Sequence, residues 1–386
     1  MIKTKCISCK TKNKFTNIFF AKKFPIFFGA VPTDLKSVKD YPLEISCCKN
    51  CNLIQQSKKI KESVVNKIYE SYYYNCPAPT ISKIGKSEIN KFLEYFKGRK
   101  NKKGKVLEIA CFDGYILRKL KKEKWDVYGC DPSPTTKNLI KILGKKKVKQ
   151  NYFSKKLFET KFDIIIFRNL LEHIYDIHGF LREIKNSLKN DGKIYIDVPN
   201  VKEILKLGGF GSFFHQHISY FSIETLNDVL KKNDFVIKNY FEGNPNMFVE
   251  AKIKKKNENF PIFKKYNPKI NNVKKKYKIF KKKLNSIFIK NKENKFVLFG
   301  ASSVATTMMY TLKNSIKKNI VLVIDNDLQK HGKLLSGSNL NISHPKMIKK
   351  IFYDKVFILT YYFADQVKKT LKKLSVKKNK IITLKP

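Results

Sequence analysis

The stretch VLEIACFDG at 106–114 decides the fold of this chain. It is a short apolar run that holds one carboxylate, Glu108, and ends in a turn at Gly114. A helical pattern follows in YILRKL, and a second apolar run ends at Asp131, twenty-three residues after Glu108. A strand, a tight turn, a helix and a second strand that ends in an acid begin an α/β sheet that presents a nucleoside at its carboxyl edge.

The residues of this turn discriminate between cofactors. A dinucleotide site needs G-x-G-x-x-G, because a pyrophosphate requires close backbone approach. Ala110 and Asp113 occupy two positions where glycines would stand. One glycine and added carboxylates suit a cofactor with a cationic amino group and no phosphate, which favours S-adenosylmethionine over NAD. We therefore predict that Glu108, Ala110, Asp113, Gly114 and Asp131 bind this cofactor; an empty α/β turn or another nucleotide is the alternative.

The next segment extends the same pattern. KFDIIIFRNLLEHI (161–174) is typical of a buried strand that runs into Asn169, Glu172 and His173, as in a methyltransferase core. Asn169 is the sixth predicted cofactor residue.

The cysteines predict a metal site near the N-terminus. Among eight cysteines, Cys6 and Cys9 form one C-x2-C pair, and Cys48 and Cys51 form another. Each pair turns two thiolates toward one ion, so we predict tetrahedral zinc in a structural role, closed by four sulfur ligands. Cys47 is a competitor, but only Cys48 keeps the two-residue spacing to Cys51. Four buried or redox-active thiols without metal are the alternative.

The net charge of +50 invites a nucleic-acid interpretation, since phosphate contacts use Lys and Arg. The cations are almost all lysines, and the arginines are Arg99, Arg118, Arg168 and Arg182. Because Arg reads guanine edges and forks onto phosphates, its scarcity weakens the case for sequence-specific recognition, and a nucleic-acid role is the alternative. We interpret the lysines as a solvated basic surface that attracts anionic substrates.

The segment MIKTKCISCK lacks an apolar leader, and no apolar run approaches the roughly eighteen residues of a membrane helix. We therefore expect a cytoplasmic protein with reduced thiols and no membrane association.

With 386 residues, 42% of them hydrophobic, the chain is long enough for two or three domains. We predict an α/β protein with a zinc-binding module at 1–65, a Rossmann-like methyltransferase domain at 66–252, and a connecting helix with a second Rossmann-like domain at 253–386. In the last domain a nucleotide could bind at Gly300–Ser303, before a predicted helix. A structural copy without a ligand is the alternative there.

Two further segments offer catalytic groups. His215 and His217 stand at i, i+2 positions of a predicted extended segment, so they should point the same way and either could act as general base. One segment offers too few ligands for a closed metal site, and two hydrogen-bonded structural histidines are the alternative. Tyr72 and Tyr74 offer phenols that could polarise a carbonyl, or they form an aromatic seam between domains.

In order and spacing, these motifs resemble the three-domain C-methyltransferases that act on nucleotide-linked deoxy-ketosugars. The resemblance spans nearly the whole chain and rests on CISC…CCKNC followed by NLIQ, on YYYNCPAP, VLEIACFDG and FFHQHISYFS, and on FGASSVATTMM…VIDNDLQKHGKLLSGSNLNISHP. It implies a zinc module, a central S-adenosylmethionine domain, and a C-terminal Rossmann-like domain that helps hold the nucleotide sugar. The catalytic segment of that family reads Tyr-His-Glu-His and its last His is the base. Here His217 keeps that place, while Phe214 and Gln216 replace the Tyr and the Glu.

The resemblance implies that His217 removes a proton from the carbon beside the sugar ketone, and that the enolate attacks the methyl group. Tyr72 or Tyr74 would stabilise the enolate, or His215 would share the task. An O- or N-methyltransferase of a related glycan precursor is the first alternative. A zinc-bearing RNA-binding methyltransferase or binding module is the second. The sequence leaves the sugar, the methylated atom and the oligomeric state open.

Overall fold

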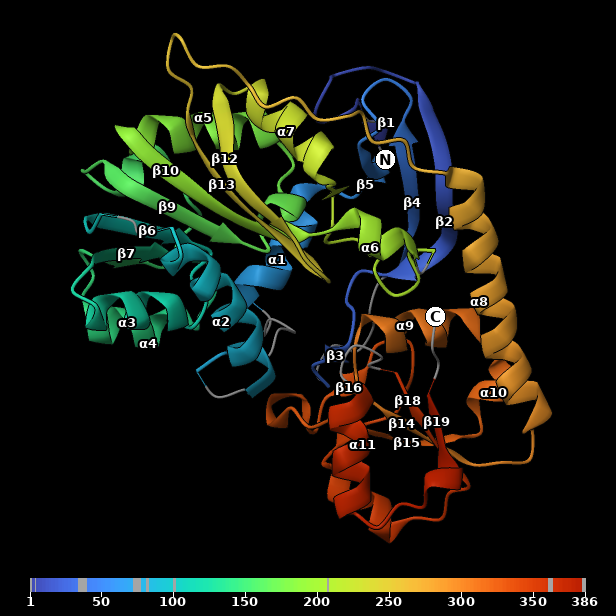
Figure 1. Ribbon diagram of the computed structural model, residues 1–386. Helices are drawn as coiled ribbons and strands as arrows, with labels where there is room; N and C mark the ends of the chain where they lie inside the picture. Colours follow the sequence, from blue (N-terminus) through green and yellow to red (C-terminus); the bar gives the residue numbers. More distant parts are fainter. Residues whose placement is uncertain are drawn as a thin grey trace. The chain divides into compact units, whose positions relative to one another are not determined.

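The computed structural model in Figure 1 describes residues 2–3, 5–33, 40–71, 78–80, 83–99, 102–206, 208–359 and 364–383. The chain forms two compact units that alternate along the sequence. The first unit comprises residues 1–17, 44–203 and 216–268, and the second comprises 18–43, 204–215 and 269–386. The predicted division into three domains, at 1–65, 66–252 and 253–386, stays a prediction. Tyr72 and Tyr74 lie outside the described residues.

The first unit is built on a seven-stranded sheet with the order β12-β13-β10-β9-β6-β7-β8. The strands from β8 to β10 are parallel, whereas β13 is antiparallel to β10, and β12 to β13. In chain order their bounds are β6 (Lys105–Ile109), β7 (Asp126–Cys130), β8 (Val148–Lys149), β9 (Phe162–Arg168), β10 (Leu188–Pro199), β12 (Phe235–Glu242) and β13 (Asn246–Ile253).

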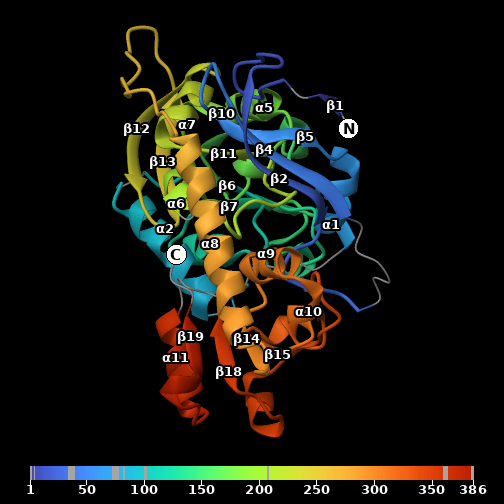
Figure 2. The same cartoon turned by 90° about the vertical axis from the view of Figure 1, so that its right-hand side faces the viewer.

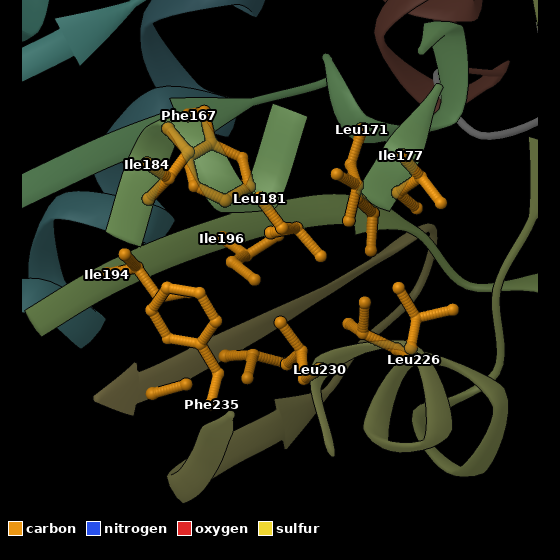
Figure 3. Packing of buried hydrophobic residues seen from close by; sticks show 14 of the residues in the cluster. Phe167, Leu171, Ile177, Leu181, Ile184, Ile194, Ile196, Leu226, Leu230 and Phe235 are labelled. Atoms are coloured by element: carbon orange, nitrogen blue, oxygen red, sulfur yellow. The ribbon is translucent and has the colours of Figure 1, made fainter. Parts of the chain in front are cut away.

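Helices cover both faces of this sheet, because successive strand residues point to opposite faces. Ile164 and Ile166 of β9 pack in a core with α2 (Lys83–Lys97), α3 (Tyr115–Lys122) and α4 (Thr136–Leu143). Ile165 and Phe167 pack on the other face, where α5 (Ile177–Ser187) and α7 (Ile223–Lys231) contribute the apolar side chains of Figure 3. This two-sided burial explains the nearly continuous apolar sequence of β9.

A smaller antiparallel sheet has the order β1-β5-β4-β2, and β11 also pairs with β5. The bounds are β1 (Ile2–Lys3), β2 (Phe15–Pro25), β4 (Asp40–Cys48), β5 (Ile54–Lys59) and β11 (Ser219–Tyr220). Helix α1 (Glu62–Ser71) follows β5, and α6 (Val201–Lys206) follows β10.

The second unit holds a parallel five-stranded sheet with the order β17-β15-β14-β18-β19. Its long helix α8 (Ile270–Lys290), orange in Figure 2, buries Val273, Phe280, Leu284 and Phe288 at helical spacing. The other elements are β3 (Ala30–Val31), β14 (Phe296–Phe299), α9 (Ser303–Thr311), α10 (Asn314–Lys317), β15 (Ile320–Ile324), β16 (Leu334–Leu335), β17 (Ile342–Ser343), β18 (Lys355–Ile358), α11 (Ala364–Lys373) and β19 (Ile381–Thr383). Short 3₁₀ helices lie at Lys155–Leu157, Leu171–His173, Leu328–Lys330, Pro345–Lys350 and Lys378–Lys380.

The predicted α/β class is confirmed, with a large Rossmann-like sheet in the first unit and a second parallel sheet near the C-terminus. Among the described residues, no helix is long and apolar enough to cross a membrane.

Candidate active site

The strand order of the large sheet reverses between β6 and β9. The chain passes from β6 outward to β7 and β8, and then returns to the other side of β6 through β9 and β10. Open α/β sheets bind ligands at the carboxyl ends of their strands at such a point. Glu108 lies near the end of β6, and Asn169 directly follows β9. The sheet therefore brings two predicted cofactor residues to its carboxyl edge.

The loop after β6 is held in a shape that few residues adopt. Ala110, Phe112 and Gly114 have φ of 57°, 48° and 71°, in the left-handed region. The Phe112 N–H donates to Asp131 Oδ2 at 3.0 Å, and the Ser133 N–H donates to Asp131 Oδ1 at 2.8 Å. The acid at the end of the second strand therefore fixes the loop of the first. The Ser133 side chain also bonds Asp131, so three of the four carboxylate lone pairs are used and one is left.

Glu108 is a buried carboxyl group with an unused oxygen. The residue is 5% exposed, and its Oε2 has no hydrogen-bond partner in the described part of the chain. Burial raises the pKa of Glu108 well above its usual value; Arg168 opposes this shift, and Asp113 and Asp131 add to it. Buried polar atoms in proteins almost always have a partner. A ligand that donates a hydrogen bond would satisfy this one.

Asp113 and Gly114 serve the loop in different ways. Asp113 Oδ2 accepts from the Thr80 N–H and hydroxyl, both at 2.8 Å, and its Oδ1 accepts from the Tyr115 N–H at 3.1 Å. These bonds tie Thr80 to the start of α3. At Gly114 a Cβ would lie 2.4 Å from Leu139 Cδ1, so the left-handed φ and close packing both require glycine.

The structure contains a buried polar network at the ends of β9, β10 and β13 that the sequence did not predict. The guanidinium of Arg168 pairs with Asp197 at 2.6 Å, and Asp197 is fully buried. The Asn246 side-chain amide donates to Asp197 Oδ1 at 2.7 Å and to Asn169 Oδ1 at 3.1 Å. Asn169 is therefore anchored by its side chain at the cofactor edge. The available signals were an Arg and an Asp, each within an apolar strand sequence.

His217 lies next to His173, at the end of the 3₁₀ helix that follows β9. The two rings have centroids 4.9 Å apart and planes at 77°. Burial lowers the pKa of His173 to about 4 and that of His217 well below its usual value. Both imidazoles are therefore neutral near pH 7, and one nitrogen of each ring carries no hydrogen.

The backbone on both sides of His217 is fixed by neighbouring elements of the same unit. Gln56 of β5 donates through its side-chain amide to His217 O at 2.8 Å and through its N–H to Ile218 O at 2.9 Å. The Ile218 N–H donates to Glu172 O at 2.7 Å. His217 is thus positioned by β5 and by the segment that follows β9.

The prediction that His215 and His217 point the same way is wrong. His215 and Gln216 form a turn, and the i, i+2 rule holds only for an extended backbone. The His215 ring is fully buried in the second unit, where Nε2 lies 3.2 Å from Phe24 O and 3.3 Å from Tyr41 O. Its contacts are those of a structural histidine, and its catalytic role stays a prediction.

The predicted zinc ligands come together. Cys6 Sγ lies 3.5 Å from Cys51 Sγ, and Cys9 Sγ lies 3.6 Å from Cys48 Sγ. All four sulfur atoms lie within 4.8 Å of one another, whereas Cys47 is not part of the group. Four thiolates around one zinc ion, at Zn–S distances of about 2.3 Å, are about 3.8 Å apart, so the sulfur arrangement fits the ion.

The two cysteine turns also share one backbone shape. In each turn the N–H four residues after the first cysteine donates to the carbonyl of that cysteine, at 2.9 Å from Lys10 to Cys6 and from Asn52 to Cys48. Lys10 and Asn52 have φ of 60° and 61°. Two equivalent turns facing each other match a zinc site better than a chance group of thiols.

Comparison with known proteins agrees with this geometry. Residues 82–239 match the family model described as "Methyltransferase domain". This part of the chain is a methyltransferase domain. Residues 292–382 match a second family model, described as "C2185-like, N-terminal".

Two curated proteins resemble parts of the chain. The C-methyltransferase NovU of Streptomyces niveus is 41% identical over 59 residues, which cover 15% of this chain and 14% of that protein. The ubiquinone biosynthesis O-methyltransferase of Pelagibacter ubique (strain HTCC1062) is 28% identical over 151 residues, which cover 35% of this chain and 62% of that protein. The chain thus spans less than two thirds of either relative.

One similar solved structure is an S-adenosylmethionine-dependent methyltransferase from Clostridium acetobutylicum ATCC 824. It has 15% sequence identity and a TM-score of 0.36, and the match covers 44% of this chain and 92% of that chain. The PH0226 protein from Pyrococcus horikoshii OT3 has 19% identity and a TM-score of 0.39, and covers 51% of this chain and 100% of that one.

Substitution of Gly114 tests the loop geometry. Gly114→Ala should lower the free energy of unfolding by about 2–4 kcal/mol, because left-handed strain adds to the collision with Leu139. The matched control is Gly332→Ala, since Gly332 has φ of +78° but nothing within 4 Å of its Cβ position. Denaturant unfolding should show the larger loss for Gly114→Ala and partial recovery in Gly114→Ala/Leu139→Ala. Equal losses for the two glycines would exclude the collision.

Proposed function

We propose that the protein is an S-adenosylmethionine-dependent methyltransferase that methylates the carbon beside the ketone of a nucleotide-linked deoxy-ketosugar. The observation that carries this proposal is the neutral His217, next to the neutral His173, in the unit that contains the methyltransferase domain. A carbon must lose a proton before it attacks a methyl group, whereas a hydroxyl oxygen or an amine already has a lone pair. A neutral base therefore suits carbon methylation.

The similarity to the two curated relatives supports methylation of carbon first and methylation of oxygen second. The short stretch similar to the C-methyltransferase NovU has the higher identity, and the longer stretch similar to an O-methyltransferase has the lower. Methylation of a hydroxyl oxygen on a related glycan precursor is accordingly the second candidate.

The cofactor would lie at the carboxyl edge of β6 and β7. Asp131 would accept from a ribose hydroxyl, because its carboxylate has one lone pair left after its three bonds to Phe112 and Ser133. Glu108 would take a hydrogen bond through its unused Oε2. S-Adenosylmethionine would supply an electrophilic methyl group there, with Asn169 beside it, fixed through Asn246.

In this proposal His217 accepts the proton from the carbon beside the ketone, and the electron pair of the broken C–H bond forms the enolate. The enolate carbon would then bond to the methyl group while the methyl–sulfur bond breaks, with S-adenosylhomocysteine as the leaving group. His173 beside it is held in place, since its Nδ1 lies 2.8 Å from Gln216 O. Gln216 stands where the family that the chain resembles has Glu. In this proposal it acts through its backbone carbonyl.

The substrate class rests on charge and on the second unit. A net charge of +50 attracts a diphosphate-linked sugar over long distances. In the second unit, the turn before α9 at Gly300–Ser303 is closed by the Ala301 N–H, which donates to Asp325 Oδ2 at 2.8 Å. We propose that the nucleotide binds at this turn.

We also propose that Cys6, Cys9, Cys48 and Cys51 hold a structural zinc ion. The closeness of their sulfur atoms and the matching turns support this assignment. Four cysteine ligands leave no open position, so the ion would stabilise the fold and take no part in methyl transfer.

The zinc content of the purified protein tests the cysteine site. Protein purified without chelator should retain one tightly bound zinc per chain at these cysteines. Cys9→Ser should lose the ion and become insoluble or unfold, because metal binding and folding are coupled in such modules. Cys47→Ser, one residue from a ligand, is the control and should keep the ion. Elemental analysis decides the outcome, and zinc-free wild type or zinc-retaining Cys9→Ser would contradict the site.

Asp131 tests the cofactor site. Asp131→Ala should weaken S-adenosylhomocysteine binding by about 1–3 kcal/mol in titration calorimetry, since ribose hydroxyls lose an acceptor. Asp126→Ala, at the opposite end of β7, is the matched control and should bind normally. A 2′,3′-dideoxy analogue separates direct contact from loop loosening. If the hydroxyls contact Asp131, the analogue should bind wild type more weakly but lose little further in Asp131→Ala; equal losses in both proteins would refute the contact.

His217 tests the reaction. With a nucleotide-linked deoxy-ketosugar in deuterated water, the hydrogen on the carbon beside the ketone should exchange, as followed by NMR. His217→Ala should slow this exchange by about 10²–10⁴-fold while cofactor affinity is kept. His215→Ala should mainly reduce thermal stability, because it removes a buried ring that binds two carbonyls. Normal exchange in His217→Ala, or a product methylated on oxygen, would favour the second candidate.

A further inference from the structure

Glu172, His173 and His217 form a second group of metal-ligand side chains, distinct from the cysteines. One ligand atom from each residue lies within 4.8 Å of the other two. Glu172 is 1% exposed, and neither of its carboxylate oxygens has a hydrogen-bond partner among the residues described. A buried carboxylate without partners is costly, so its retention requires an explanation.

The hydrogen bonds of His173 show which of its nitrogens faces Glu172. His173 Nδ1 lies 2.8 Å from Gln216 O, and a carbonyl only accepts, so Nδ1 carries the hydrogen. In the neutral ring, Nε2 then has the lone pair. This nitrogen lies 3.8 Å from Glu172 Oε1. Two acceptors therefore face each other in a buried place, and a positive group between them would satisfy both.

A proton and a metal ion are the two possible occupants. A proton shared between Glu172 and His173 would draw the two atoms to about 2.7 Å, the usual length of such a hydrogen bond. The separation of 3.8 Å exceeds that length. Two ligands bound tetrahedrally to one ion at about 2.0–2.2 Å each lie about 3.4 Å apart, which is closer to the observed separation. The distance thus favours an ion.

The surroundings also resemble those of metal-bound histidines. Such histidines donate their other N–H to a carboxylate or a backbone carbonyl, which fixes the tautomer. His173 does this through Gln216 O. Two histidines and one carboxylate are the ligands of zinc sites that keep a position open, and they suit other divalent transition metals.

We propose that Glu172, His173 and His217 bind one divalent transition-metal ion of the Zn²⁺ or Co²⁺ type. This site goes beyond the proposed function, because its occupation is measured without any methyl acceptor. An imidazole that binds an ion through one nitrogen carries its hydrogen on the other, so it cannot also accept a proton. Ion binding and the base role of His217 therefore exclude each other, and the ion would inhibit proton removal.

The experiment titrates the full-length protein, with its cysteine site filled by zinc, with Co²⁺. We expect one further equivalent to bind, with the weak visible bands of nitrogen and oxygen ligands and without the strong near-ultraviolet absorption of cobalt thiolates. Glu172→Gln and His173→Gln should each weaken this binding at least tenfold. Glu88→Gln, which removes an exposed carboxylate of the same unit, is the matched control and should bind like wild type.

Glu172→Gln separates loss of the ion from loss of the fold. Gln has the same size as Glu, and its amide can donate to His173 Nε2, so the metal-free variant should melt at or above the temperature of metal-free wild type. Absence of the further equivalent in wild type, or equal Co²⁺ affinity in Glu172→Gln and wild type, would overturn the proposal.

Different results would reject the ion site and the proposed reaction. If no further Co²⁺ binds but His217→Ala abolishes hydrogen exchange, the ion site is rejected and the base role stands. If Co²⁺ binding depends on Glu172 and His173 while exchange persists in His217→Ala, the base role is rejected and the ion site stands.

Discussion

Four residue pairs, from Val106–Ile164 to Ile109–Phe167, join β6 to β9 in parallel. This pairing places the two loops that follow the strands at one edge of the sheet. The first loop carries the turn up to Gly114, and the second carries Asn169 and then Glu172 with His173. A shift of one residue would turn every side chain of β9 to the opposite face, and both helix-covered cores would lose their packing. Burial on both faces therefore fixes the register, and the register fixes the site.

Local patterns were sufficient to predict the places of Glu108, Gly114 and Asp131 in the fold. The first lies in β6, the second has a left-handed φ, and the third directly follows β7, because strand length and turn shape depend on adjacent residues. Their binding of a cofactor stays a prediction. The spacing of Cys48 to Cys51 likewise selected Cys48 over Cys47, and the sulfur positions agree.

Contacts between distant segments, and one local turn, could not be predicted in this way. Arg168, Asp197 and Asn246 meet only because three strands are neighbours in the sheet, and nothing near each residue indicates its partners. The prediction that His215 and His217 point the same way failed for another reason. Their spacing has meaning only on an extended backbone, and the turn at His215 places each ring among different neighbours.

The cysteine turn and His217 are linked by two adjacent residues of β5. Gln55 accepts through its side chain from the Ile7 N–H at 2.9 Å, between the two cysteines of the first turn. Gln56 donates to the carbonyl of His217 from the same strand. The cysteine turn and the histidine segment, which pairs with the edge of β5, are thus bonded to the same short strand. A structural ion that orders the cysteine turns would thereby also limit the movement of His217, so that the ion would affect the proposed catalysis through position alone.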